Sequence, residues 1–236
     1  MGLPFSDQVA VVTGASSGVG EAIAQSLATG GVKLCVVGRN LKTLQKTFKD
    51  ARAIQADLRV EENIMELKRV IEHDFGRVDI LVHSAGIWSK GPVEGAPASD
   101  FDELYLLNVR APYLLTQALI PMLKGQKGQV VFINSSVGLR SKAGIAQYAA
   151  TKHALKALAD GLRDEVNESG VRVLSVYLGS TATPMQERIH KTEGHAYHPE
   201  LLLQPSDVAS IVVGSLLLPR TAEVTDITIR PMKKPG

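Results

Sequence analysis

Short apolar segments alternate with longer amphipathic segments along the chain. The longer segments repeat their apolar residues every three or four positions, near residues 19–29, 40–49, 61–75, 100–124, 147–168 and 206–218. The short segments are β-branched and almost continuously apolar, as is typical of parallel strands covered on both faces, at residues 8–13, 33–37, 53–56, 79–83, 129–134, 171–177 and 226–229. This alternation predicts an α/β fold with a doubly wound parallel sheet and helices on both faces.

The alternation continues without a linker, an internal repeat or a low-complexity stretch, and 236 residues are enough for one large α/β domain. We therefore expect a single domain over residues 1–236. Its exception is the segment 180–204, STATPMQERIHKTEGHAYHPELLLQ, which is long and polar and precedes the last predicted helix. Long polar segments at the edge of a sheet often carry binding functions, so this one is expected to contact substrate or form a lid.

Composition argues against several classes of protein. The net charge of +2 predicts no electrostatic footprint for nucleic acid. No segment approaches the roughly 18 uninterrupted apolar residues of a membrane span. The opening residues MGLPFSDQ lack the basic start and apolar run of a secretory signal. Cys35 is the only cysteine, which rules out an internal disulfide and fits a reducing cytoplasm, so we expect a cytoplasmic protein.

Three of the six histidines, His190, His195 and His198, lie in the polar segment. They lack the HxxxH pairing and the cysteine or aspartate partners that typical zinc sites use. We expect these histidines to be solvated or to face substrate, and we expect no metal. His83, at the end of a predicted strand, lies nearest to the expected cofactor site.

A glycine-rich stretch, TGASSGVGEAIA, follows the first predicted strand and opens the first predicted helix. Gly14, Gly18 and Gly20 have the spacing GxxxGxG. Without side chains at these positions, a tight turn can bring backbone N–H groups against a pyrophosphate, which the positive end of the helix also attracts. The position between strand and helix, more than the glycines alone, predicts a dinucleotide-binding site.

The end of the second predicted strand, VVGRN, indicates which dinucleotide binds. In folds that bind NAD, an acidic residue at this strand end accepts hydrogen bonds from the adenosine ribose. Gly38 occupies that place, and the guanidinium of Arg39 can pair bidentately with a 2′-phosphate. NADP(H) is therefore expected rather than NAD(H). Asp57, followed by Leu58 after the third strand, is expected either to bond the adenine amino group or to cap the next helix.

Tyr148 and Lys152 lie four residues apart at the start of a predicted helix, so they share one face, one turn apart. A free tyrosine has a pKa of about 10, and a neighbouring ammonium favours the phenolate and lowers that pKa. This pair can therefore exchange a proton with a reacting oxygen. Taken alone, the same spacing is also that of a surface tyrosine beside a snorkelling lysine.

Four motifs together resemble the classical short-chain dehydrogenase/reductase family, and the resemblance covers residues 9–231. The motifs are TGASSGVG, Asn108 in LNVRAP, the serines of INSS, and YAATK. The resemblance implies a single-domain Rossmann fold with a seven-stranded parallel sheet. It also implies a catalytic tetrad, which this chain would supply as Asn108, Ser135, Tyr148 and Lys152. We expect Ser135 rather than Ser136, because neighbouring strand residues point to opposite faces and the family places its serine thirteen residues before the tyrosine.

The resemblance also implies roles for individual residues. In the family the lysine bonds the nicotinamide ribose, and the serine of the tetrad would bond the carbonyl oxygen. Asn108, whose polar side chain is mildly unfavourable in a helix, can interrupt the predicted helix locally and hold a water on the proton path. Thr183 stands where the family contacts the nicotinamide carboxamide. The expected cofactor contacts are Gly14, Ser16, Ser17, Gly18, Val19, Gly20, Arg39, Asp57, Leu58, Ala85, Gly86, Tyr148, Lys152, Gly179, Thr181 and Thr183.

Three stretches depart from the family pattern. The fourth strand usually ends Asn-Asn-Ala-Gly, whereas this chain has His83, Ser84, Ala85 and Gly86. The sixth strand usually ends Pro-Gly, and Leu178 replaces that proline. The last strand runs into ITIRPMKKPG without the Asp-Gly-Gly of many relatives, which argues against a ketoreductase acting on acyl carrier protein.

Together these features predict an NADP-dependent oxidoreductase that transfers a hydride between nicotinamide and a small carbonyl or alcohol substrate. A ketone or aldehyde reductase is the first expectation. The alternatives are an NAD(P)-dependent alcohol or hydroxy-acid dehydrogenase, and a dinucleotide-binding protein without turnover. Family relatives commonly form dimers or tetramers through the helices predicted at 100–124 and 147–168. We expect a homotetramer or homodimer, with the core or the interface formed by residues such as Tyr113, Leu114, Leu155 and Leu158.

Overall fold

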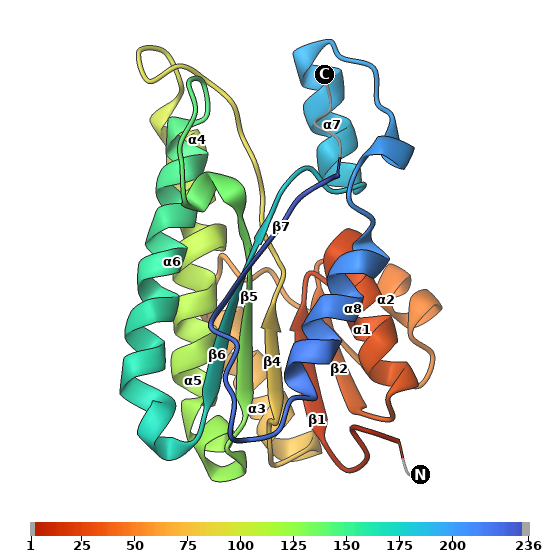
Figure 1. Ribbon diagram of the computed structural model, residues 1–236. Coiled ribbons are helices and arrows are strands. Elements are labelled where there is room, and N and C mark those ends of the chain that lie inside the picture. The colour runs from red at the N-terminus through yellow and green to blue at the C-terminus, as the bar shows by residue number, and fades with distance from the viewer. Residues whose placement is uncertain (1–2, 233–236) are drawn as a thin grey trace.

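Seven parallel strands form one sheet in the order β3-β2-β1-β4-β5-β6-β7 (Figure 1). The structure is a computed structural model that describes residues 3–232; residues 1–2 and 233–236 of the predicted domain lie outside that range. The strands are β1 Val9–Thr13, β2 Lys33–Gly38, β3 Arg52–Gln55, β4 Ile80–His83, β5 Gln129–Ser135, β6 Arg172–Leu178 and β7 Asp226–Ile229. Every predicted strand boundary lies within one residue of the observed one, and the predicted doubly wound, Rossmann-type fold is confirmed.

Helices cover both faces of this sheet. They are α1 Gly18–Thr29, α2 Leu41–Thr47, α3 Glu61–Asp74, α4 Ala98–Tyr105, α5 Ala111–Gln126, α6 Ala146–Val166, α7 Pro184–Glu193 and α8 Pro205–Leu216. The helix predicted at 100–124 is interrupted locally around Asn108, as expected, because a π-helical turn over Leu106–Arg110 separates α4 from α5. The helix α7 was not predicted, since few apolar residues interrupt its polar sequence. Its start is nevertheless well defined, because Thr183 accepts a hydrogen bond from the backbone of Gln186 and Pro184 follows the cap.

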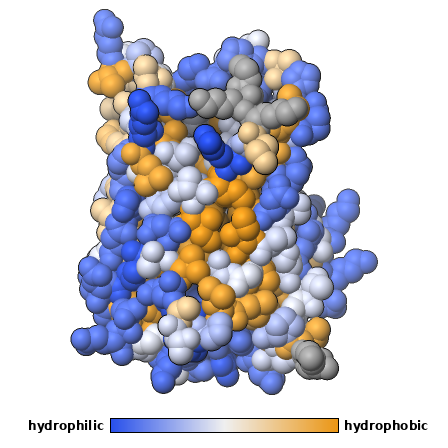
Figure 2. Space-filling view, in the orientation of Figure 1, coloured by the Kyte–Doolittle hydropathy of each residue, from blue (hydrophilic) through white to orange (hydrophobic). Residues whose placement is uncertain are grey.

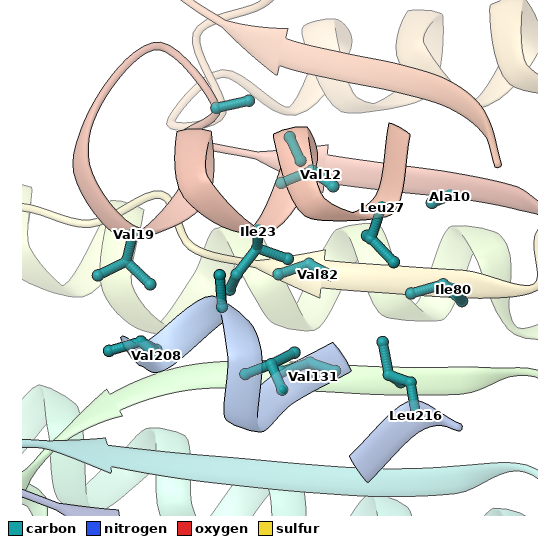
Figure 3. Close-up of a cluster of buried hydrophobic side chains, with 14 of the residues drawn as sticks. Ala10, Val12, Val19, Ile23, Leu27, Ile80, Val82, Val131, Val208 and Leu216 are labelled. Carbon is teal, nitrogen blue, oxygen red and sulfur yellow. The ribbon is translucent and has the colours of Figure 1, made fainter. Parts of the chain in front are cut away.

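The apolar core lies in two layers, one on each face of the sheet. On one face α1 and α8 pack against the strands, and on the other α3, α5 and α6 do so. Figure 3 shows Ile23 and Leu27 of α1 and Val208 and Leu216 of α8 in one cluster with the strand residues Val82 and Val131. Burial of each such side chain contributes roughly 1.5–3 kcal/mol. Because both faces are covered, all five residues of β1 are buried, as its continuous apolar sequence predicts.

The segment 180–204 leaves the body of the protein and returns to it at one place. Thr181 and Leu203 form a parallel bridge, and Leu203 also accepts a hydrogen bond from the backbone of Ala182 at 2.8 Å. Between these anchors, α7 and a 3₁₀ turn at Pro199–Leu201 project beyond the carboxyl ends of the strands (Figure 1). The helices within residues 3–232 include none with the length and apolar character needed to span a membrane.

Candidate active site

The strand order changes direction between β1 and β4, and a cavity of about 580 Å³ opens there, at the carboxyl ends of the strands. Such crevices are the usual ligand sites of open α/β sheets. Residues after β2 and β3, including Arg39 and Asp57, line one end, and Tyr148 and Lys152 on α6 line the other. All residues expected to contact the cofactor line this cavity except Gly20. A Cβ atom on Gly20 would lie 2.5 Å from the carbonyl oxygen of Gly14, so Gly20 allows α1 to pack closely against the loop.

The glycine loop has the backbone geometry that a dinucleotide cradle requires. Gly14 and Gly18 have φ angles of +68° and +60°, a region that L side chains rarely adopt. A Cβ on Gly14 would lie 2.7 Å from the backbone nitrogen of Ala85, and one on Gly18 would lie 2.9 Å from the Thr183 side chain. Ser17 caps α1 without a side-chain hydrogen bond to the helix, so the first N–H groups of α1 can face an anion. These features fit the pyrophosphate of a dinucleotide.

The adenosine end of the cavity carries charged residues of both signs. Arg39 is exposed, and within residues 3–232 no carboxylate lies at ion-pair distance from it. Asp57 is held by Arg59, with Nε to Oδ1 at 3.0 Å and Nη2 to Oδ2 at 2.5 Å. This hydrogen bonding lowers the pKa of Asp57. The alternative that Asp57 caps the next helix is wrong, because Val60 occupies the cap of α3.

Tyr148 and Lys152 are buried on one face of α6, with Lys152 Nζ 5.9 Å from the centre of the tyrosine ring. Burial raises the pKa of Tyr148 to about 12, although a hydrogen bond with Ser135 opposes that rise. Burial lowers the pKa of Lys152 to about 8. The expectation that Lys152 lowers the tyrosine pKa is therefore not met here, because loss of water outweighs the other influences on the phenol. The ammonium instead donates to the carbonyl oxygen of Ile133 at 3.2 Å.

The two neighbouring serines differ in their environment. Ser135 ends β5, is half-buried, accepts a hydrogen bond from the backbone N–H of Val137 at 3.4 Å, and lies close enough to Tyr148 to oppose the rise in the pKa of the phenol. Ser136 begins the following 3₁₀ turn and is exposed, although it also lines the cavity. The geometry therefore supports Ser135 as the partner of Tyr148.

Asn108 lies in the π-helical turn and is almost completely buried, at 1% exposure. Its carboxamide accepts from the backbone N–H of Ile87 at 2.9 Å and donates to the carbonyl of Ile87 at 3.0 Å. It also donates to the hydroxyl of Thr151 on α6, which in turn bonds the carbonyl of Tyr148 at 2.8 Å. Asn108 does not line the cavity. It joins the loop after β4 to the helix that carries Tyr148.

A second buried asparagine, Asn134, has a similar role that the sequence did not reveal. Its side chain donates to the carbonyl of Lys152 at 3.1 Å and accepts from the N–H of Ser135 at 2.8 Å. It therefore fixes the end of β5 against the first turns of α6. Its only signal in the sequence is its place before the serines of INSS.

His83 is a packing residue rather than a cavity residue. It is stacked on Phe132 with ring centres 5.0 Å apart, and its Nε2 lies 2.8 Å from the hydroxyl of Thr116. Burial lowers its pKa to about 3, so the ring is neutral at physiological pH. In the polar segment, His190 bonds the backbone of Gln186. Across the described part of the chain, no group of three histidine, cysteine or acidic side chains is placed to hold a metal.

Several cavity residues beyond the predicted set come from loops and from α7. They include an aromatic side chain, three cations and one carboxylate, namely Trp88, Lys90, Lys142, Arg188 and Glu193. They lie on the Tyr148 side of the cavity because their segments follow β4, β5 and β6. These residues belong to no motif and to no apolar pattern, so they could not be selected from the sequence.

Comparison with known proteins agrees with this fold and site. A family model described as short chain dehydrogenase matches residues 8–194. An uncharacterized oxidoreductase of Staphylococcus epidermidis is 36% identical over 232 residues, which cover 96% of this chain and 98% of that protein. The short chain dehydrogenase from Shigella flexneri superposes with a TM-score of 0.90 at 28% identity, covering 100% of this chain and 96% of that one.

A further solved structure is a short chain dehydrogenase from Burkholderia cenocepacia in complex with NADP. It has a TM-score of 0.83 and 29% identity, and the match covers 96% of this chain and 97% of that one. The chain belongs to the short chain dehydrogenase family. It is an oxidoreductase that acts on CH–OH or C=O groups with a nicotinamide dinucleotide.

Proposed function

We propose that this protein is an NADP-dependent reductase of ketones or aldehydes, able to catalyse the reverse oxidation of the alcohol. The observation that carries the proposal is one cavity that contains a glycine cradle, Arg39, and the group Ser135, Tyr148 and Lys152. The Burkholderia relative in complex with NADP supports the choice of cofactor. When bound, the dinucleotide supplies the hydride in reduction and accepts it in oxidation.

Different residues of the cavity would bind different parts of the cofactor. The N–H groups at the start of α1 bind the pyrophosphate, and the guanidinium of Arg39 pairs with the 2′-phosphate. Lys152 would bond the ribose next to nicotinamide, and Thr183, which lies against Gly18, would contact the carboxamide. Asp57, already oriented by Arg59, would bond the adenine amino group.

Tyr148 then acts as the proton donor at its Oη atom. With a pKa raised to about 12 the phenol is protonated at neutral pH, although the same rise makes it a weaker acid than a free tyrosine. Ser135 donates a hydrogen bond to the substrate oxygen and stabilises the negative charge that develops there. The charge of Lys152 favours the phenolate left behind. That Asn108 holds a water on the proton path stays a prediction, since its carboxamide already bonds Ile87 and Thr151.

Purified protein mixed with NADPH and a panel of aldehydes and ketones tests the proposal directly. We expect oxidation of NADPH with at least one carbonyl compound, and no oxidation with the Tyr148→Phe variant. Tight NADPH binding without turnover of any carbonyl or alcohol would instead support the alternative of a dinucleotide-binding protein without activity.

The choice of NADP over NAD has its own test in Arg39. Arg39→Glu replaces a cation with a carboxylate, which repels a 2′-phosphate and can bond a free ribose hydroxyl. We expect NADPH affinity to fall about tenfold or more while NADH affinity stays equal or rises. Titration of both cofactors by fluorescence measures the effect. Equal affinity of the unmodified protein for the two cofactors would contradict the assignment.

We also propose that the segment 180–204 forms a lid over the substrate, within one catalytic domain. Its helix α7 supplies cavity residues, while its ends are held at Thr181 and Leu203. The chain is further proposed to assemble as a homotetramer or homodimer. Exposed aromatic residues on α4 and α5 support that assembly, at Phe101, Tyr105 and Tyr113.

A further inference from the structure

The substrate end of the cavity, bounded by Tyr148, the loop after β4, the loop before α6 and the helix α7, has an excess of positive charge. Apart from Lys152, three cations line it, Lys90, Lys142 and Arg188. Glu193 is the one carboxylate lining this end among the described residues, and it pairs with Lys90 at 3.0 Å. Its charge is therefore already balanced.

Lys142 and Arg188 have no such partner. Within residues 3–232, no carboxylate lies at ion-pair distance from either side chain. The remaining acid of the cavity, Asp57, lies at the adenosine end and is bonded to Arg59. Both side chains are exposed, so they line the open part of the cavity, where two cations without a carboxylate partner produce a positive potential that attracts an anion.

The two cations reach the cavity from different walls. Lys142 lies in the loop between Ser135 and Tyr148, so it belongs to the wall that carries the proton donor. Arg188 lies on α7, which belongs to the lid. Apolar side chains also line this end, at Ile87, Trp88, Ile145, Met185 and Ile189.

The cofactor phosphates do not account for this charge. The pyrophosphate cradle lies at the start of α1, and Arg39 lies at the end of β2, on the opposite side of the β1–β4 crevice from the loop of Lys142. A guanidinium can hold a carboxylate or phosphate with two parallel hydrogen bonds, and an ammonium adds a point charge.

We propose that Lys142 and Arg188 select substrates in which the reacting carbonyl or alcohol is accompanied by an anionic group, a carboxylate or a phosphate. This inference rests on the proposed oxidoreductase function and names the chemical class of its substrate. The apolar lining accommodates the carbon skeleton, and the two cations orient its charged end away from Tyr148.

Matched substrate pairs test this selection. One pair is an oxo acid and its methyl ester, and the other is a hydroxyketone phosphate and its parent hydroxyketone. We expect at least one anionic member to exceed its neutral partner in kcat/KM by about tenfold or more. The pair that shows the preference identifies the anionic group as carboxylate or phosphate. Equal or better turnover of both neutral members would overturn the proposal.

Variants assign the preference to the two residues. Lys142→Gln and Arg188→Gln should each reduce the preference for the anion about tenfold, while the Kd for NADPH stays unchanged. Arg140→Gln and Lys191→Gln are matched controls, because these side chains are exposed like Lys142 and Arg188 and lie on the same loop and helix, but do not line the cavity. An equal loss in these controls would show a general charge effect and contradict the assignment.

A binding measurement separates this inference from the proposed activity. Trp88, the one tryptophan of the chain, lines the cavity, so its fluorescence should report ligand binding. The Tyr148→Phe protein saturated with NADPH should bind the oxo acid or the phosphate more tightly than its neutral partner. If no carbonyl is turned over but this preference remains, the oxidoreductase proposal fails and the anion site stands. If carbonyl compounds are turned over but the preference is absent, the oxidoreductase proposal stands and the anion site fails.

Discussion

Burial acts on Tyr148 and Lys152 in opposite directions. It raises the pKa of the phenol to about 12 and lowers that of the ammonium to about 8. At neutral pH both groups therefore keep their protons, and the tyrosine is ready to act as an acid. In the oxidative direction the phenol must first lose its proton, so Lys152 is needed to favour the phenolate.

Substitution of the two residues should give different kinetic results. Tyr148→Phe removes the proton donor but keeps the ring, so turnover should fall about 10²–10⁴-fold while NADPH affinity stays near normal. Lys152→Met should lower turnover and NADPH affinity together, because it removes both the charge and the ribose contact. Ser135→Ala should cause a large loss of turnover, and Ser136→Ala should cause a small one. Steady-state turnover and NADPH titration on each variant measure these effects, and near-normal turnover of Tyr148→Phe would refute the assignment.

The lowered pKa of Lys152 predicts a pH dependence of cofactor binding. A lysine with a pKa near 8 is charged below that pH and loses its proton as the pH rises through it. Its bond to the ribose should weaken accordingly, so NADPH affinity should fall up to about tenfold between about pH 7 and pH 9. Titrations of the unmodified protein and of Lys152→Met test this, since the variant should show a flat profile over the same range.

Among the elements, β5 and α6 matter most to the site, because Ser135 ends β5 and Tyr148 lies in the first turn of α6. Asn134 joins them by bonding the carbonyl of Lys152 and the N–H of Ser135. Gly138 has a matching role, because a Cβ there would lie 2.8 Å from the carbonyl of Lys152. The relative position of serine, tyrosine and lysine thus depends on groups that never touch substrate.

Asn134→Ala should therefore act as a positioning mutation. We expect kcat to fall about tenfold or more with little change in the KM for substrate, and the melting temperature to fall because buried backbone groups lose their partner. Asn134→Asp retains the acceptor and should recover part of the activity only if the bond to Ser135 N–H matters. A fall in stability with unchanged kcat would show that Asn134 serves the fold alone.

The elements that the sequence predicts well are those with a continuous or periodic apolar pattern. The buried strands could be located to within one residue for this reason. A local interruption at Asn108 could be expected from its polar side chain, but its π-helical form and the bonds of Asn108 to the distant residues Ile87 and Thr151 could not. For α7, the cap formed by Thr183 and Pro184 and the left-handed Gly194 at its end were available signals that its polar sequence obscured.

The same distinction holds for the site. Motif residues such as Gly14, Arg39 and Tyr148 line the cavity as expected, because their local sequence determines the turn, strand end or helix that carries them. Arg59 and Arg188 could not be selected from the sequence, because only the fold brings them to Asp57 and to the substrate end. Whether such a side chain lines a cavity depends on packing between residues far apart in the chain, and a single sequence does not show that packing.

At the scale of the whole molecule, two surfaces carry exposed apolar residues. One is formed by Phe101, Tyr105 and Tyr113 on α4 and α5. The other includes Ile211 on α8 and Leu217 just after it, which are exposed. Figure 2 shows apolar side chains along the middle of the face that carries β7 and α8. Two separate surfaces favour a tetramer over a dimer. Leu155 belongs to the core, at 3% exposure, and so cannot serve an interface.

Analytical ultracentrifugation at micromolar concentration should therefore give a mass about four times that of the 25.3 kDa chain. Phe101→Glu combined with Tyr113→Glu should leave dimers held by the second surface, and Ile211→Glu combined with Leu217→Glu should leave dimers held by the first. Substitution of Val93, which is exposed but lies outside both surfaces, is the control. A monomeric mass for the unmodified protein would contradict the proposed assembly.

The bridge between Thr181 and Leu203 has a consequence for how such a protein can diversify. The two anchors lie side by side, so the segment between them starts and ends at one point of the protein. Its length and composition can therefore vary without moving the sheet or the glycine loop that binds the dinucleotide. Transplanting residues 184–201 from a relative should thus transfer the preference for one small molecule over another and leave the choice of dinucleotide unchanged.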